Sequence, residues 1–487
     1  MTNNIQPSPS SQEVPHIIIA GGGITGLAAA YYLEKRVKSK GTSLRYTLLE
    51  KSDELGGKIV TEKQDGYLID GGPDSFITRK PWGVSLCRDL GLEDELIGTN
   101  DELRNIFVLS DGKLKPMPEG LMLVVPTRFL PFATSSLISI PGKLRMGMEP
   151  FIPPRIEDGD ETLASFIRRR LGEEALKKLA APLLSGIYVS DPERLSLKSS
   201  FPRLLELERE YGSLTKGMIA ARRKAAAWRK EHGKSSLSMF VTLRKGMEQL
   251  VHALEGHLDS SSVQTGLRVT SVTSEEENGP PYLVKIEGGQ TLRADAVILS
   301  TPARVSSHLL EDLDPQLSQQ LDEIRFTSTA VVTLGYPPQN GMPALDGFGF
   351  LVPETENRHI NACTWTSTKF DHRSPDSHKL IRCFLGGPGK EELVDWDDQT
   401  MINTVRRELN EIMSFQAQPE MTRIYRWHKA HPQYDLGHMD REEKIRQRAD
   451  THQGLALAGS SYDGVGIPDC IRQAEEAVES LGFPENK

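Results

Sequence analysis

The stretch IIIAGGGITGLAAA (residues 17–30) joins an apolar run to three consecutive glycines and then to a string of small residues. Residues 16–20 (HIIIA) form a short, largely β-branched run followed by glycine, which predicts a short buried parallel strand, and residues 24–38 predict the helix that follows. Between them Gly21, Gly23 and Gly26 form G-x-G-x-x-G, which permits a tight turn, close approach to a pyrophosphate, and packing of the helix on the strand. Because a helix N-terminus offers free N–H groups to phosphates, this unit predicts dinucleotide binding.

A second predicted strand, residues 45–50, ends on Glu50, at the spacing expected for an acid that binds a ribose hydroxyl. A carboxylate there would repel a 2′-phosphate, which disfavours NADP and leaves FAD or NAD. Further along, 261–272 and 294–303 predict strands of one more pairing unit. Near the C-terminus a strand, a glycine loop and a helix that begins near Pro468 are predicted within residues 454–481.

The composition narrows the class of protein. The chain has 487 residues, 38% of them hydrophobic, which indicates about three domains with sizeable cores. The net charge of −9 disfavours nucleic acid as a partner, and it means that an anionic substrate needs a local basic pocket. The four cysteines form no C-x-x-C pair, and three histidines in 427–438 lack an acid at a useful interval, so no metal site is predicted.

Membrane and targeting signals are weak. The first 15 residues are polar and lack the features of a secretory signal. Prolines interrupt the most apolar segment, 120–142, at positions 126, 131 and 141, so this segment can lie on a membrane but is not expected to cross one. The basic run 221–234 is a second candidate for lipid contact. We expect a cytoplasmic protein with at most peripheral membrane contact.

Four stretches resemble known flavoproteins. EKSDELGGK (50–58) resembles the dinucleotide-binding flavoproteins of the amine-oxidase and protoporphyrinogen-oxidase superfamily. GYLIDGGPDSFITRK (66–80), LLSGIYVSDPERLSLKSSFPRL (183–204) and GVGIPDCI (464–471) resemble the flavin-dependent protoporphyrinogen and coproporphyrinogen oxidases. The resemblance runs from about Val14 to Leu481 and is strongest to the Gram-positive bacterial branch, whose members oxidise coproporphyrinogen III to coproporphyrin III.

The resemblance implies an α/β fold: a discontinuous, Rossmann-like FAD-binding domain with a mixed-sheet substrate domain and a helical domain. The expected boundaries are 14–78, 239–303 and 425–487 for the FAD-binding domain, 79–200 for the helical domain, and 201–238 and 304–424 for the substrate domain.

The resemblance also implies a non-covalent FAD, because no cysteine context resembles the covalent attachment site of the monoamine oxidases. The expected FAD-binding residues are Gly21, Gly22, Gly23, Ile24, Thr25, Gly26, Glu50, Lys51, Gly57, Lys58, Gly72, Pro73, Asp74, Ser75, Val269, Trp427, Val465, Gly466 and Ile467.

The substrate is expected in an apolar slot against the flavin, with cations for its propionates. The expected substrate-binding residues are Arg79, Lys80, Ile187, Tyr188 and Phe384, with Arg194 and Lys198 as candidate cations on the other side. No side chain is needed as nucleophile, because the flavin N5 is the expected hydride acceptor and O₂ the final oxidant, giving H₂O₂. Other enzymes of haem synthesis are candidate partners.

Three other functions remain open from the residues. A protoporphyrinogen IX oxidase would share the same ring chemistry. A carotenoid desaturase or amine oxidase would give no reason for Arg79 and Lys80 beside the flavin segment. A non-redox binding protein of this fold, like the GDP-dissociation inhibitors, would be expected to lack Glu50 or the loop 464–467, and both are present.

Overall fold

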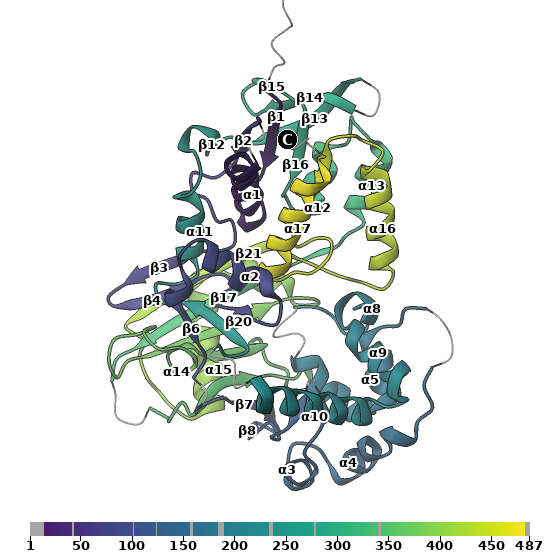
Figure 1. Ribbon diagram of the computed structural model, residues 1–487. Helices are drawn as coiled ribbons and strands as arrows, with labels where there is room; N and C mark the ends of the chain where they lie inside the picture. The colour runs from purple at the N-terminus through teal and green to yellow at the C-terminus, as the bar shows by residue number, and fades with distance from the viewer. Residues whose placement is uncertain are drawn as a thin grey trace, which may run out of the picture.

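A computed structural model of the protein describes residues 14–40, 43–100, 102–122, 124–155, 159–183, 189–232, 237–276, 279–338 and 342–482. Three regions are visible (Figure 1): a parallel sheet with helices in the upper part, a large sheet at the lower left, and a group of helices at the lower right.

Five parallel strands form the sheet of the upper region. In spatial order they are β12 (Val263–Gln264), β2 (Arg45–Leu49), β1 (His16–Ala20), β16 (Ala296–Leu299) and β22 (Leu455–Leu457). All five residues of β1 are buried, as the apolar run predicts. Since the strands come from the start, middle and end of the chain, the expected discontinuous Rossmann-like unit is confirmed.

Helices cover one face of this sheet, and a small antiparallel sheet together with further helices covers the other. The first face carries α1 (Ile24–Lys40), α2 (Pro81–Asp89), α11 (Glu248–Glu255) and α17 (Ile467–Ser480). The second face carries β13 (Val269–Glu276), β14 (Gly279–Ile286), β15 (Thr291–Ala294), α12 (Ala303–Leu309), α13 (Pro315–Asp322) and α16 (His438–Ala449). Of the segments predicted as strands of one more pairing unit, 261–272 contributes β12 and 294–303 contributes β16 to this one parallel sheet, whereas β13 pairs with β14 in the small antiparallel sheet.

A seven-stranded mixed sheet forms the second region. In spatial order it contains β21 (Met421–Pro432), β17 (Phe326–Tyr336), β20 (Lys379–Gly386), β19 (Ala362–Trp365), β18 (Gly347–Leu351), β7 (Asn105–Ser110) and β8 (Lys113–Pro116). Only the β18–β7 pair is parallel. One face packs on α15 (Asp398–Met413), and the other carries Arg382 and Phe384 toward the glycine loops.

Two segments of this sheet were expected elsewhere. β7 and β8 fall within the predicted helical region 79–200, but β7 pairs with β18 and β8 pairs with β7, which extends the sheet. β21 extends into the predicted FAD-binding segment 425–487, yet it pairs with β17 along most of its length. Pairing with other strands of the sheet decides where the β7–β8 hairpin and β21 lie. No short sequence motif predicts these pairings.

The third region is a unit of helices with its own apolar core. It contains α3 (Phe129–Thr134), α4 (Ile140–Gly147), α5 (Leu163–Arg170), α6 (Glu173–Ala175), α8 (Leu197–Ser200), α9 (Pro202–Tyr211) and α10 (Leu214–His232). Residues 201–238 were expected in the substrate domain, but α9 and α10 bury Leu204, Leu207 and Leu214 in this helical core instead.

Shorter elements connect the regions. These are β3 (Thr61–Gln64) with β4 (Tyr67–Asp70), the sheet of β5 (Phe76–Ile77), β11 (Phe240–Leu243) and β6 (Leu96–Gly98), β9 (Leu121–Met122) with β10 (Val125–Pro126), and α14 (Thr366–Lys369). Within the described residues, no helix is long and apolar enough to cross a membrane.

A buried ion pair joins α5 to the start of α10 within the helical unit. Glu149 and Arg170 are both fully buried and hydrogen-bonded to each other. The Glu149 carboxylate also accepts hydrogen bonds from the Ser213 hydroxyl (2.6 Å) and from the backbone N–H groups of Leu214 and Thr215 (2.8 and 3.0 Å). It therefore satisfies free donors at the N-terminus of α10 as well as the buried guanidinium.

We expect Glu149→Ala to lower the free energy of unfolding by about 3–5 kcal/mol, because it leaves the buried Arg170 guanidinium with Glu208 (3.3 Å) as its remaining described counter-charge and leaves the Ser213, Leu214 and Thr215 donors without their acceptor. Urea unfolding monitored by circular dichroism measures the change. The control is Glu206→Gln, which removes an exposed pair with Arg203 on α9 and should change stability by no more than about 0.5 kcal/mol. Equal losses in the two variants would contradict the assignment.

Candidate functional site

The first glycine loop lies between β1 and α1. Gly21 has a φ of +109°, which suits glycine, and the Ser300 hydroxyl donates to its carbonyl (2.8 Å). A Cβ on Gly26 would lie 1.9 Å from the Gly21 carbonyl oxygen. The helix and the strand therefore approach so closely that only glycine fits at position 26, which is the third role predicted for the motif.

Glu50 lies just beyond β2 with its carboxylate buried against this loop. Its Oε2 accepts a hydrogen bond from the Gly22 N–H (2.6 Å), and its Oε1 accepts from the Ser52 N–H (2.9 Å). The backbone of Leu267 donates to the Glu50 carbonyl, so the segment leading to Val269 runs alongside. The carboxylate is thus fixed where an adenosine ribose is expected, and the half-buried Val269 follows two residues after Leu267.

A second glycine pair completes a cradle made of backbone. The Gly56 N–H donates to the Gly22 carbonyl (2.9 Å), and a Cβ on Gly57 would lie 3.2 Å from the Gly23 Cα. At Gly23 itself a Cβ would meet nothing within 4 Å. The two loops are therefore in contact, and the open side at Gly23 lets a ligand reach the backbone. This geometry, together with the N-terminus of α1, fits the pyrophosphate of a dinucleotide.

The neighbouring expected residues lie along the same loops. Ile24 and the buried Thr25 open α1, and Lys51 is exposed. The Lys58 ammonium donates to the Ala430 carbonyl of β21, and burial lowers the pKa of Lys58. Lys58 therefore connects the second glycine loop to the large sheet.

Residues 71–75 run between the glycine loops and the large sheet. The Arg382 guanidinium of β20 donates to the Gly72 carbonyl (2.7 Å) and lies 3.2 Å from the Asp74 carboxylate. Lys369 forms a second ion pair with Asp74 (3.0 Å), and the Ser75 hydroxyl donates to the same carboxylate. Although burial alone would raise the pKa of Asp74, the charges of Lys369 and Arg382 hold it below its usual range.

Trp427 comes from β21 and reaches the same segment. Its indole N–H donates to the Gly71 carbonyl (3.0 Å). Four residues after Trp427 on the same strand, the His431 ring is hydrogen-bonded to the Thr329 hydroxyl (2.9 Å). Burial, together with the charge of Lys58, lowers the pKa of His431 to about 4, so this imidazole is neutral at pH 7. Trp427 thus belongs to the large sheet, although its side chain contacts the segment where a flavin is expected.

The C-terminal loop packs over the start of α17. Gly464 has a φ of +99°, and its N–H donates to the Tyr434 hydroxyl (2.9 Å). Gly466 precedes the first turn of α17, which begins with the buried Ile467 and Pro468, while Val465 is exposed. The loop therefore leads directly into the N-terminus of α17 near Pro468, where the sequence predicts the helix to begin.

The structure gives mixed evidence on the expected substrate residues. Lys80 forms an ion pair with Asp469 (2.6 Å), whereas the adjacent Arg79 is exposed and has no ion pair with another described residue. Phe384 is half-buried on the face of β20 that carries Arg382, whose guanidinium lies over the ring. Ile187 and Tyr188 lie outside the described residues.

Arg194 and Lys198, the two cations expected on the other side of the slot, have different surroundings. Arg194 shares the Asp435 carboxylate with Arg325. Lys198 is exposed on α8. Neither is brought next to Arg79 or Lys80 by a contact in the described structure, so their role remains a prediction.

Sequence reasoning missed several residues that hold the site. These are Ser300, Lys369, Arg382, Tyr434 and Asp469. Each meets a residue of another segment that lies far away in the chain, so only the pairing of elements reveals it. One signal was available, since a buried strand such as 379–386 carries an arginine only where that charge has a partner.

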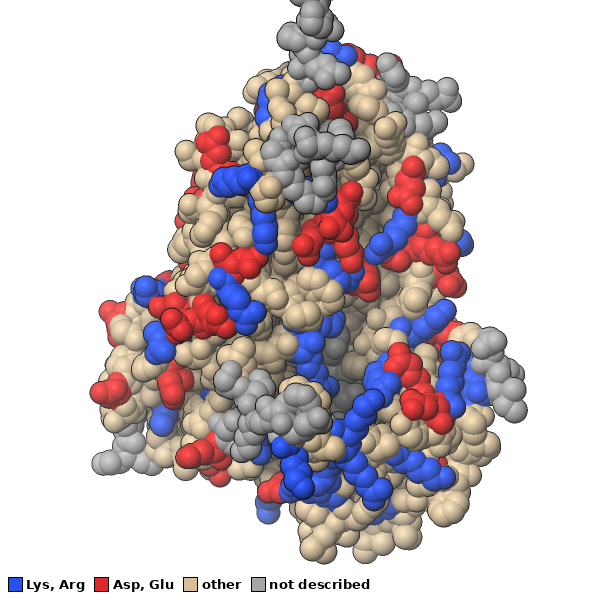
Figure 2. Space-filling model, in the orientation of Figure 1, with Lys and Arg blue, Asp and Glu red and all other residues tan. Residues whose placement is uncertain are grey.

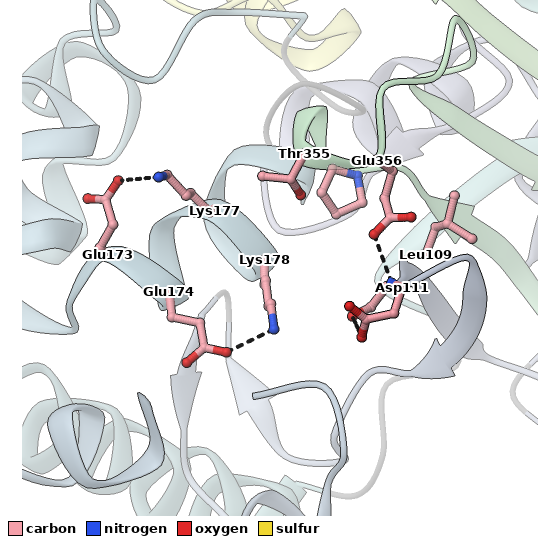
Figure 3. Close-up of a pocket in the computed structure, with 10 residues that line it drawn as sticks. Leu109, Asp111, Glu173, Glu174, Lys177, Lys178, Thr355 and Glu356 are labelled. Atoms are coloured by element: carbon pink, nitrogen blue, oxygen red, sulfur yellow. Dashed lines mark hydrogen bonds and ion pairs between the residues drawn. The ribbon is translucent and has the colours of Figure 1, made fainter. Parts of the chain in front are cut away.

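A pocket of about 510 Å³ lies elsewhere, between the helical unit and the β7–β8 hairpin (Figure 3). Its charged side chains pair mainly with each other: Lys177 with Glu173 (3.2 Å) and Lys178 with Glu174 (2.9 Å). No residue of the glycine loops lines it, so its chemistry is separate from the site described above. Within the described part of the chain, no cluster of His, Cys, Asp or Glu could hold a metal ion.

The chain is similar to known proteins along nearly its whole length. It is 39% identical to the coproporphyrinogen III oxidase of Bacillus subtilis, covering 95% of this chain and 97% of that one, and 34% identical to that of Staphylococcus aureus, covering 96% and 98%. A crystal structure from Exiguobacterium sp. 255-15 is 33% identical, with a TM-score of 0.84 over 96% of this chain and 98% of that one.

More distant structures show the fold alone. Putrescine oxidase is 15% identical, with a TM-score of 0.67 over 96% of this chain and 98% of its own. The family model described as flavin containing amine oxidoreductase matches residues 24–481. The chain therefore belongs to the flavin containing amine oxidoreductase family.

Proposed function

We propose that this protein is an FAD-dependent oxidase that converts coproporphyrinogen III to coproporphyrin III in haem synthesis. A flavin is the cofactor of its family. The observation that carries the proposal is similarity over almost the full length to coproporphyrinogen III oxidases, with Arg79 and Lys80 directly after the segment expected under the flavin.

FAD fits the cradle better than FMN would, because the site has a place for adenosine as well as for pyrophosphate. Glu50 offers its carboxylate just beyond β2, and Gly23 and Gly57 leave backbone accessible beside it. Non-covalent binding is supported by the cysteines, which are all buried. Burial raises the pKa of Cys470, at the start of α17, to about 11, so its thiol is a poor nucleophile.

Bound FAD supplies the hydride acceptor for removing hydrogen from the porphyrinogen ring. The protein residues position the ring and the propionates: Phe384 presents an apolar face, and Arg79 and Lys80 present cations. Full conversion removes six electrons and six protons, and transfer to three O₂ gives three H₂O₂. Other enzymes of haem synthesis that supply the substrate or take the product are candidate partners.

Protoporphyrinogen IX is the second candidate substrate. Plant protoporphyrinogen oxidases are 29% identical over 96% of this chain, and the oxidised ring is the same in both substrates. The tetra-acid is favoured because Arg79 is a free cation among the described residues, and a site built for a carboxylate leaves its cation unpaired against a vinyl group.

We expect Glu50→Gln to weaken FAD binding roughly tenfold or more, because a charge-assisted hydrogen bond to the ribose, about 1.5–3 kcal/mol, is lost. Titration of the apoprotein with FAD, followed by flavin fluorescence, gives the Kd. The control is Glu54→Gln, an exposed acid on the same loop, which should leave the Kd within twofold. An unchanged Kd in Glu50→Gln would refute the ribose assignment.

Rapid mixing with porphyrinogen under anaerobic conditions tests the function. We expect coproporphyrinogen III to bleach the flavin, and porphyrin fluorescence to develop in air with a kcat/KM at least tenfold above that for protoporphyrinogen IX, since each unpaired cation costs about 1–3 kcal/mol. Both substrates are compared in the same detergent. If neither substrate bleaches the flavin, the proposed function is wrong, whereas equal kcat/KM values overturn only the substrate preference.

We further propose a peripheral membrane contact at the end of the helical unit. Large apolar side chains are exposed there; by exposed fraction they are Phe129 (59%), Leu130 (76%), Ile140 (73%), Leu144 (67%), Met148 (58%) and Phe151 (84%). In Figure 2 this end is tan at the bottom, with Lys and Arg side chains gathered above it over the region of α10. An apolar tip flanked by cations is typical of proteins that bind the surface of anionic membranes.

We expect Leu130→Glu/Phe151→Glu to reduce binding to vesicles of phosphatidylglycerol and phosphatidylcholine at least tenfold, because both side chains would leave the bilayer interface. Vesicle flotation at low and high salt measures binding, which should weaken in salt. Leu103→Glu, at an exposed leucine outside the tip, is the matched control. Unchanged flotation of the double variant would count against the contact.

A further inference from the structure

We infer that Asp469 is a positioning residue for the active site. With Lys80 it forms an ion pair, called the clamp below, that holds the C-terminal loop (464–467) against the segment 72–80, which is expected under the flavin. Lys80 keeps one donor for a substrate carboxylate. The substrate part rests on the proposed function, whereas the clamp itself does not.

The clamp joins two segments that lie 389 positions apart in the chain. The Lys80 ammonium donates to both carboxylate oxygens of Asp469, at 2.6 and 2.7 Å. Lys80 immediately precedes α2 and follows the segment 72–76, while Asp469 is in the first turn of α17. Packing supports the same contact, because a Cβ on Gly83 of α2 would lie 3.2 Å from Pro468.

Asp469 also shapes the loop that it closes. A Cβ on Gly464 would lie 2.4 Å from the Asp469 carboxyl carbon, and one on Gly466 would lie 3.2 Å from its Oδ2. The loop therefore wraps directly around this carboxylate. The acid is favourable at the positive end of α17, and a buried carboxylate needs the Lys80 charge beside it.

The side chains of Asp469 and Lys80 differ in solvent exposure, and this difference gives each residue a separate role. The Asp469 side chain is 8% exposed, whereas that of Lys80 is 46% exposed. An ammonium has three N–H donors, and the two Asp469 oxygens occupy two of them. The third donor can bind an incoming carboxylate while the clamp stays closed. Asp469 thus fixes a flexible lysine in place, which lowers the entropic cost of binding the substrate.

The first test measures FAD binding without substrate. We expect Asp469→Asn and Lys80→Met each to raise the Kd for FAD about tenfold, and the double variant to differ from either single variant by no more than twofold, since both remove one interaction. Lys80→Arg should restore near wild-type binding. Glu476→Gln, which removes an exposed ion pair with Arg472 on α17, is the control and should leave the Kd unchanged.

The second test separates positioning from a general structural role. Asp469→Asn should raise the KM for coproporphyrinogen III several-fold when Lys80 is present, and should have no further effect in the Lys80→Met background. Equal effects in both backgrounds, additive losses of FAD affinity, or an FAD Kd within twofold of wild type in both single variants would each overturn the clamp. If FAD binding responds as expected but no porphyrinogen is oxidised, the clamp stands and the proposed function fails.

Discussion

The close contact of α1 with β1 is the constraint on which the cofactor site depends. At Gly26 no side chain fits, because a Cβ would overlap the Gly21 carbonyl, and at Gly22 one would overlap Glu50 and Leu55. Because neither position carries a side chain, the start of α1 can lie directly over the end of β1, and the Gly22 N–H can donate to Glu50. Gly56 then packs on Gly22, which places the second loop. Later segments are added around this fixed centre.

The glycine motif could be predicted from sequence because its physics is local. A buried strand, a turn with positive φ and a helix start are each determined by residues within about ten positions, and β1, α1 and β2 lie where the sequence predicts. Glu50 is predictable for the same reason, since it ends the strand next to the loop. The strand at Leu455–Leu457 and the helix after Pro468 follow from similar local signals.

Long-range pairing was not predictable in the same way. Trp427 lies on a strand whose position is set by its register with β17, Trp427 opposite Thr329, and a single sequence does not specify that partner. The Asp74 ion cluster likewise needs β20 to pass residues 72–75. The helices α9 and α10 have apolar faces that could pack on either neighbouring unit, and only the full set of elements shows that they complete the helical core.

The charges around the site resolve an apparent conflict in the composition. A chain with a net charge of −9 repels an anionic ligand at long range, so attraction has to arise locally. Asp74 is shared by Lys369 and Arg382, which leaves one positive charge in excess beside the segment expected under the flavin. Asp469 neutralises Lys80, while Arg79 has no acidic partner among the described residues. Both segments that flank the expected flavin therefore carry excess positive charge within an acidic protein. Since Lys369 and Arg382 are mostly buried, salt screens their charges little, and this arrangement favours phosphate and carboxylate groups at the site without making the whole surface basic.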